Sequence, residues 1–160
     1  MKSPDADFHR ALQYAFLLLR YRDRSEKELF QRLQRKGFAE ETSRNVGSYL
    51  REKDFLNDAR LAESLKRTAV EQKHLGKRGL VHYLSLKGIP AEIVDNISGN
   101  EEDYVESAAS LVERKLGQMK GLDEIVVKRR LWGLLVRKGY SPAMISRVLK
   151  RYLSDDESCP

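Results

Sequence analysis

The chain has 160 residues, 41% of them apolar, which suits a folded protein of one or two domains and excludes an intrinsically disordered chain. Its only cysteine is Cys159, which excludes an intrachain disulfide and gives no sign of an oxidising compartment. The N-terminus, MKSPDADFHRAL, lacks the pattern of a signal peptide and no apolar run approaches a membrane span, so we expect a cytoplasmic protein without a membrane segment.

The net charge is +6, and the basic residues are concentrated toward the two ends of the chain. Residues 1–53 carry 12 Lys and Arg against 8 Asp and Glu, residues 54–104 carry 7 against 9, and residues 105–160 carry 11 against 7. A positive net charge favours nucleic acid or an acidic protein as the partner, although the solvated helices of ordinary proteins are also rich in Lys and Arg. Charge alone therefore leaves the partner open.

Residues 1–53 are predicted to form a first repeat of three helices. The second helix has a start signal in Ser25 and Glu28, because the serine hydroxyl can accept from the third backbone N–H and the carboxylate can reach back to the cap. A third helix is expected from Ala39 to about Lys53. The first helix is predicted from apolar residues at helical spacing: Phe8, Ala11, Leu12, Ala15, Leu18 and Leu19.

Residues 54–99 are predicted to form a second repeat. Asp58 is interpreted chiefly as the cap of its first helix, ARLAESLKR. The third helix of this repeat is expected from Pro90 to Ser98. The first two helices of the second repeat are predicted from apolar residues at helical spacing: Leu61, Ala62, Leu65, Ala69, Leu80, Val81 and Leu84.

Residues 100–153 are predicted to form a third repeat, and residues 154–160 an acidic tail. Ser141 followed by Pro142 is a strong helix start, because proline at the first helical position loses no needed donor. We expect this last helix to run from Pro142 to Leu153. Apolar residues again predict the two preceding helices: Tyr104, Val105, Ala108, Leu111, Val112, Leu131, Trp132 and Leu135.

The three repeats share a register of 51 residues. Gly37, Gly88 and Gly139 lie at this interval, and each follows a lysine and precedes a large apolar residue. Glycine directly after a helix adopts the left-handed conformation without a steric penalty, so each is predicted to end a helix with positive φ. Other positions keep the same interval: Leu29, Leu80 and Leu131; Leu33, Leu84 and Leu135; Lys36, Lys87 and Lys138; Phe38, Ile89 and Tyr140; Val46, Ile97 and Val148.

Self-similarity at a fixed period is typical of repeat proteins, whose units bury their apolar faces against one another. No stretch of the sequence has the pattern of a strand of useful length. The predicted fold class is therefore all-α, an elongated tandem array of three three-helix repeats with a 51-residue period.

A search for catalytic or metal-binding patterns gives none. His9, His74 and His82 have no cysteine or carboxylate at metal-ligand spacing, and Gly76 and Gly79 are too few for a phosphate-binding loop. We therefore expect no enzyme activity, no cofactor and no metal.

Clusters of Lys and Arg are the candidate contact residues. They favour phosphate or acidic side chains as ligands, although cations near helix ends also complement the helix dipole and aid solubility. The candidates are Arg20, Arg22, Arg24, Lys27, Arg32, Arg35, Lys128, Arg129, Arg130, Arg147, Lys150 and Arg151.

Two helices joined at a glycine turn also describe a helix-turn-helix, so an array of DNA-binding units is the alternative hypothesis. The third helices PAEIVDNISG and PAMISRVLKRY argue against it, because they offer few side chains for base edges and the first of them is acidic.

The sequence resembles the bacterial RecX family of regulatory proteins over about residues 8–152. The segments LGKRGLVHYLSLKGI and LWGLLVRKGYSPAMISRVL resemble its later repeats, and DFLNDARLAES, with Asp58 and Ala62, its first junction. The pattern R-x-R-S-x-x-E-L-x-x-x-L-x-x-K-G, similar to the family's first repeat, consists of Arg22, Arg24, Ser25, Glu28, Leu29, Leu33, Lys36 and Gly37.

The resemblance implies a helical protein that binds the filament of the RecA recombinase along its groove. It implies a modulator that usually inhibits ATP hydrolysis and strand exchange, with a role in DNA repair and the SOS response. We expect a monomer, with at most weak non-specific contact with DNA. The sequence departs from the family at Leu61, where an aromatic residue is frequent, and in the third repeat, which has LDEIVVKRR instead of a serine cap.

Overall fold

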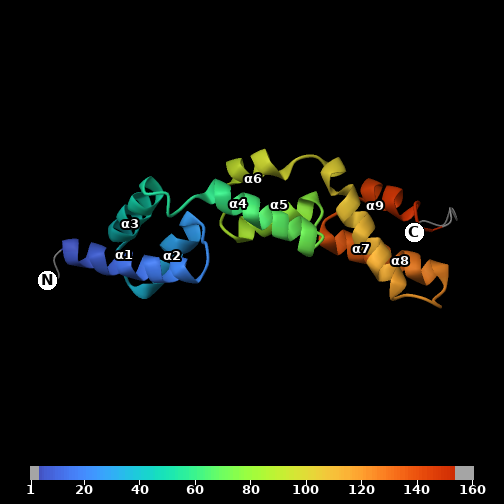
Figure 1. Ribbon diagram of the computed structural model, residues 1–160, viewed down its shortest axis with the longest axis horizontal. Helices are drawn as coiled ribbons and strands as arrows, with labels where there is room; N and C mark the ends of the chain where they lie inside the picture. Colours follow the sequence, from blue (N-terminus) through green and yellow to red (C-terminus); the bar gives the residue numbers. More distant parts are fainter. Residues whose placement is uncertain (1–3, 154–160) are drawn as a thin grey trace. The chain divides into compact units, whose positions relative to one another are not determined.

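The computed structural model describes residues 4–153, and these residues form α-helices joined by short connections, with no β-strand among them (Figure 1). The predicted all-α class is confirmed. The predicted acidic tail, 154–160, and Cys159 lie outside the described residues.

The first repeat contains helices α1 (Pro4–Tyr21), α2 (Glu26–Lys36) and α3 (Glu40–Glu52). The hydroxyl of Ser25 accepts from the Glu28 N–H at the start of α2, as predicted. Helix α3 matches its predicted span within one residue at each end, because Ala39 is its extended N-cap and Lys53 its C-cap.

The second repeat contains α4 (Asp58–Arg67), α5 (Lys77–Leu86) and α6 (Ala91–Ser98). A π-helical turn, η1 (Thr68–Gln72), follows α4. His74, two residues after this turn in the sequence, has a positive φ of 51°. No sequence pattern predicted this irregular turn.

The third repeat contains a 3₁₀ turn, η2 (Glu101–Tyr104), and helices α7 (Val105–Gly117), α8 (Glu124–Lys138) and α9 (Pro142–Leu149). The prediction that the last helix reaches Leu153 is wrong. Beyond Leu149 the chain tightens into a turn, because the N–H groups of Arg151 and Tyr152 donate to carbonyls three residues back. The N-cap of α8 is Asp123, whose carboxylate accepts from the Ile125 N–H in place of a serine.

The three repeat glycines end their helices as the sequence predicts. Gly37, Gly88 and Gly139 have φ values of 98°, 82° and 88°, in the left-handed region. The leucines that share their 51-residue register are completely or almost completely buried, with at most 1% exposure: Leu29, Leu80, Leu131, Leu33, Leu84 and Leu135.

The chain forms two compact units, and the division passes through the second repeat. Unit 1 comprises Met1–Ser64 and Leu84–Val94, and unit 2 comprises Leu65–Tyr83 and Asp95–Pro160. The core of unit 1 packs residues of the first repeat: Ala11, Ala15, Leu29, Leu33, Val46, Leu50 and Leu56. The buried residues of unit 2 include Ala108, Leu111, Val112, Leu131, Leu135, Ile145 and Val148.

Within residues 4–153, none of the helices is both long enough and apolar enough to span a membrane.

Candidate functional site

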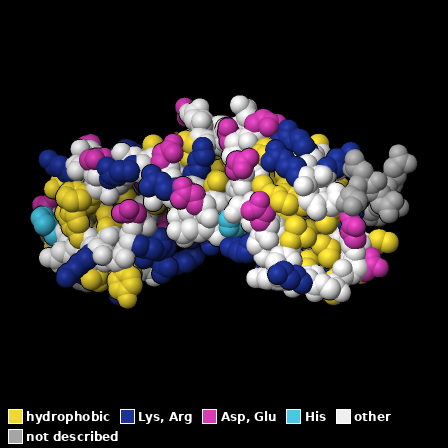
Figure 2. Space-filling view, turned by 45° about the vertical axis from the view of Figure 1, so that its right-hand side comes forward, with side chains coloured by type: hydrophobic (Ala, Val, Ile, Leu, Met, Phe, Trp, Pro, Cys, Tyr) yellow, Lys and Arg dark blue, Asp and Glu magenta, His cyan; other side chains and the backbone are white. Residues whose placement is uncertain are grey.

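The Lys and Arg side chains differ in whether a neighbouring carboxylate of the protein neutralises their charge. On the face shown in Figure 2, Lys and Arg side chains are mixed with Asp and Glu. A cation held by a neighbouring carboxylate belongs to the fold, whereas an exposed cation without one is available to a partner.

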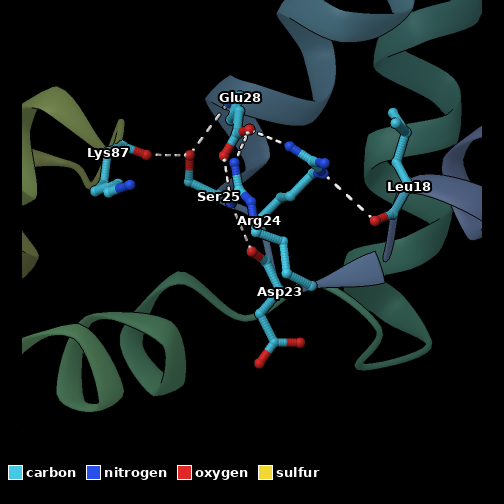
Figure 3. A network of polar contacts seen from close by, with 7 residues as sticks. Leu18, Asp23, Arg24, Ser25, Glu28 and Lys87 are labelled. Carbon is cyan, nitrogen blue, oxygen red and sulfur yellow. Dashed lines mark hydrogen bonds and ion pairs between the residues drawn. The ribbon is translucent and has the colours of Figure 1, made fainter. Parts of the chain in front are cut away.

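Ser25 lies at the start of α2 and connects this helix to Lys87, which is also in unit 1. Its hydroxyl donates to the Lys87 carbonyl, at 2.6 Å, and accepts from the Glu28 N–H at 3.2 Å. Figure 3 shows both bonds at the one oxygen. Because Lys87 follows α5, one buried side chain caps α2 and also satisfies a carbonyl at the end of α5.

The Glu28 carboxylate accepts hydrogen bonds from two arginines (Figure 3). Arg22 approaches it at 2.5 and 3.0 Å, and Arg24, whose side chain is only 8% exposed, also donates to the Leu18 carbonyl at 3.4 Å. Burial favours a higher pKa for Glu28, but its hydrogen bonds to Arg22 and the charges of both arginines together lower that pKa. The prediction that this carboxylate reaches back to the cap is wrong, because two guanidinium groups bind it instead.

Asp58 caps a different helix from the one predicted. It is the first residue of α4, whose cap is Asn57, with the Asn57 side-chain oxygen 2.9 Å from the Arg60 N–H. The Asp58 carboxylate instead accepts from the Glu26 N–H of α2, at 2.9 Å. Partial burial and the nearby charge of Glu26 raise the pKa of Asp58 despite this bond. The interpretation of Asp58 as a local cap is therefore wrong, and the residue joins the first two repeats.

A groove of about 400 Å³ lies in unit 1 between α2 and the last turn of α5. Four of the predicted contact residues line it: Arg22, Lys27, Arg32 and Arg35. Lys87 and Leu86, which is 73% exposed, line the opposite side. The sequence analysis missed Lys87 because the Lys-Gly pair was interpreted only as the end of a helix.

Lys27, Arg32 and Arg35 differ from the other arginines and lysines around α2. All three are exposed, and within residues 4–153 none of them forms an ion pair or a side-chain hydrogen bond. By contrast, Arg44, Arg51 and Arg60 pair with Glu40, Glu26 and Asp54 at the surface of unit 1. The groove therefore has three available cations on one side of α2.

The remaining predicted residues are in several different environments. Arg20 is exposed near the end of α1, and Arg129 and Arg130 are exposed on α8. Arg147 donates through both terminal nitrogens to Glu102, at 2.7 and 2.9 Å, and this hydrogen bond lowers the pKa of Glu102. Three other predicted residues also contact groups of the protein: Arg151, 3.7 Å from Glu106, and Lys128 and Lys150.

In unit 2, the segment after η1 lies against the end of α8. The Gly76 N–H donates to the Lys138 carbonyl at 2.9 Å, the Lys138 ammonium donates to the Lys73 carbonyl at 2.7 Å, and the Tyr140 hydroxyl donates to the His74 carbonyl at 3.1 Å. His74 is buried, so the interpretation of this residue as a surface or half-buried histidine is wrong. Among residues 4–153, no three His, Cys, Asp or Glu side chains are grouped to hold a metal ion.

Comparison with known proteins identifies the family. Family models match residues 11–50 as the first three-helix domain of RecX, residues 57–96 as the second and residues 101–149 as the third. Regulatory protein RecX of Amycolatopsis mediterranei is 34% identical over 154 residues, which cover 95% of this chain and 88% of that protein. The chain belongs to the RecX family.

Other RecX proteins agree with this assignment. Regulatory protein RecX of Chlorobium limicola is 30% identical over 155 residues, and this match covers 97% of each of the two chains. The crystal structure of RecX from Lactobacillus salivarius superimposes with a TM-score of 0.79 at 24% identity, over 91% of this chain and 96% of that one, and so has the same fold. The predicted resemblance and the tandem three-helix repeat are both confirmed.

Proposed function

We propose that this RecX-family chain binds the RecA recombinase filament along its groove and inhibits the ATPase, strand-exchange and coprotease activities of RecA. It thereby regulates recombination, DNA repair and the SOS response. The observation that carries the proposal is the match to all three RecX domains in consecutive order along one chain. The chain acts by binding, as a cytoplasmic monomer, and performs no catalysis of its own.

The groove in unit 1 supplies the contact with the filament. Lys27, Arg32 and Arg35 are exposed and carry no counter-ion within the described part of the chain, so their charges can meet carboxylates of a partner without breaking an existing ion pair. Arg22 and Arg24 have a different role, because both hold Glu28 and one of them is buried. They support the groove and are not its recognition surface.

Arg20, Arg129 and Arg130 are further contact candidates because they are exposed. Arg147 and Arg151 are weaker ones, since Glu102 and Glu106 already lie beside them. The alternative function, a DNA-reading array, has less support. Helix α6 would be a recognition helix, yet it exposes Glu92 and Asp95, which phosphates would repel.

Co-sedimentation with RecA filaments tests the proposal. Filaments are assembled on single-stranded DNA with a slowly hydrolysed ATP analogue, and the chain is added at fixed salt. We expect the chain to pellet with the filaments and to remain in the supernatant with RecA alone. A chain that stays in the supernatant with intact filaments would remove the proposed function and leave the fold unaffected.

A further inference from the structure

Four cations outside the residues discussed above as contacts come from three segments of unit 2 that contact one another. Lys73 follows the π-helical turn η1, Arg114 and Lys115 lie in the last turn of α7, and Lys138 ends α8. The Lys138 ammonium donates to the Lys73 carbonyl at 2.7 Å, which fixes the first and last of these segments together.

Helix α7 is held against the same segment two turns before Arg114. The Ser107 hydroxyl donates to the Val70 carbonyl at 2.7 Å and lies 3.3 Å from Nδ1 of His74. Because seven residues complete two helical turns, Arg114 lies on the same side of α7 as Ser107. The contacts therefore bring the end of α7 toward Lys73 and Lys138.

Lys138 lies close enough to the other three cations for their charges to act on it. Burial lowers the pKa of Lys138, and the positive charges of Lys73, Arg114 and Lys115 lower it further. Within the described residues, none of the four forms an ion pair. Lys73 lies 5.7 Å from the centre of the Tyr83 ring, Lys115 donates to Gln118, and the Lys138 ammonium bonds only to backbone.

The repeat explains why this cluster has no carboxylate. Lys73 and Lys138 correspond, 51 residues later, to Arg22 and Lys87 of unit 1. In unit 1, Glu28 neutralises Arg22, but its counterpart in unit 2 is Gly79. A Cβ at Gly79 would lie 2.2 Å from the Lys138 carbonyl oxygen, so no acidic side chain fits there.

The backbone at this cluster is also irregular. A π-helical turn precedes Lys73, and His74 has a left-handed backbone, which is uncommon for a residue with a side chain. Such features occur frequently at functional sites, because they cost free energy that a regular helix would not. Together with four cations that lack a counter-ion, they indicate a site completed by an external anion.

We propose that Lys73, Arg114, Lys115 and Lys138 bind the phosphodiester backbone of a DNA strand. A strand carries one negative charge per nucleotide, spaced by about 3.4 Å in B-form DNA, so a few consecutive nucleotides match four clustered cations. Ammonium groups act as point charges toward phosphate and need no particular base, so the contact is independent of sequence. This site is separate from the groove and does not depend on RecA.

Fluorescence anisotropy with a labelled oligothymidylate of 30 nucleotides tests this site on the full chain in the absence of RecA. The variant Lys73→Gln/Arg114→Gln/Lys115→Gln leaves Lys138 and its bond to the Lys73 carbonyl in place. The matched control Lys27→Gln/Arg32→Gln/Arg35→Gln loses the same three charges in unit 1. We expect the first variant to lower affinity at least about tenfold and to reduce the slope of log affinity against log salt by about 2, and the control to lose less than about threefold.

Equal losses in the two variants would overturn the proposal, because binding would then follow net charge alone. Equally tight binding of polyglutamate by the unmodified chain would overturn it as well, since the site would then not prefer phosphate. The proposal would also be overturned if the unmodified chain did not bind the oligonucleotide.

Thermal unfolding separates a binding role from a structural one. Removing cations whose charges act against that of Lys138 is expected to leave the melting temperature unchanged or to raise it, and the oligonucleotide should raise it in the unmodified chain only. A strong fall in the melting temperature of both the triple variant and Arg114→Gln would assign the cluster to the fold and contradict the proposal.

Discussion

The two junctions between consecutive middle helices satisfy the same carbonyl in different ways. In unit 1, the side chain of Ser25 donates to the carbonyl of Lys87. In unit 2, the backbone N–H of Gly76 donates to the carbonyl of Lys138. Both donors and both acceptors are equivalent positions at the 51-residue period, so the repeat conserves the contact but not the chemical group that makes it.

The difference depends on how closely the backbones approach. In unit 2, a Cβ at Gly76 would lie 2.7 Å from the Gly139 carbonyl oxygen, and one at Gly79 would lie still closer to that of Lys138. In unit 1, Ser25 and Glu28 occupy these two positions, and the serine hydroxyl bridges the wider gap. The wider junction keeps a carboxylate for its arginines, whereas the closer one leaves its cations without one.

The largest expected effect comes from adding a methyl group to the close junction. The Cβ in Gly139→Ala would lie 2.1 Å from the Gly79 nitrogen, at a φ of 88°, so we expect a loss of about 3 kcal/mol or more in the free energy of unfolding. Gly37→Ala has a similar φ but no atom within 4 Å, and should cost about 1 kcal/mol. Urea denaturation measures both. Equal losses in the free energy of unfolding for the two variants would show that the positive φ alone, and not the close approach of Gly79, sets the cost.

The next effect tests the charged network of the wider junction. Glu28→Gln leaves the buried Arg24 without a charged partner, and we expect a loss of about 2 kcal/mol. The control Glu40→Gln breaks an exposed ion pair with Arg44 and should change the free energy of unfolding by less than about 0.5 kcal/mol.

The same variant should respond to acid. Because the folded-state pKa of Glu28 is lowered, its stabilisation is present above the ordinary value of 4.5 and is lost as the pH falls through the lower folded value. The stability difference between the unmodified chain and Glu28→Gln should therefore narrow below pH 4.5. If the stability difference between the unmodified chain and Glu28→Gln stayed constant until acid unfolded both, ionised Glu28 would not stabilise the fold.

A smaller effect is expected from Ser25→Ala, which removes the α2 cap and the bond to the Lys87 carbonyl. We expect a loss of about 1.5 kcal/mol in urea denaturation. Ser141→Ala removes the cap of α9 and a bond to the Glu101 side chain, and should cost about 1 kcal/mol. If Ser25→Ala proved neutral, the hydroxyl would not be what joins the two helices.

The smallest effect concerns His74 in the close junction. Burial and the charges of Arg114 and Lys138 lower its pKa below the ordinary 6.5, so its contribution is present above that pH and declines as the pH falls through the folded value. The melting temperature of the unmodified chain should fall more between pH 7.5 and 5.5 than that of His74→Asn, which tolerates the left-handed backbone. Identical falls would show that His74 protonates freely in the fold.

Much of the fold could be predicted because its determinants are local or periodic. The left-handed glycines, the buried leucines and the Ser25 and Ser141 caps all follow from short patterns repeated along the chain. Asp58 and Glu28 were misassigned because the partner of a carboxylate depends on which segments the fold brings together. The sequence pattern at Asp58 cannot distinguish a cap for its own helix from a cap for α2.

The candidate site was only partly predictable for the same reason. Arg24 and Lys27 are equally basic in sequence, yet the former is 9% exposed overall and paired, and the latter is exposed. Charge density identified the region of α2 but not which cations were neutralised. The 51-residue period could have identified Lys87, because it places a lysine at the end of every middle helix.

The central claim is that exposed cations without a counter-ion, and not cations in general, make the contact with RecA. The most direct measurement is the concentration that half-inhibits the RecA ATPase on single-stranded DNA, at fixed salt, for two variants that each lose three charges in unit 1. For Lys27→Gln/Arg32→Gln/Arg35→Gln we predict an increase of at least about tenfold, or about 1.4 kcal/mol. For Arg44→Gln/Arg51→Gln/Arg60→Gln, whose cations pair with carboxylates, we predict a change within about twofold. Equal increases in both variants, or no inhibition by the unmodified chain, would contradict the account.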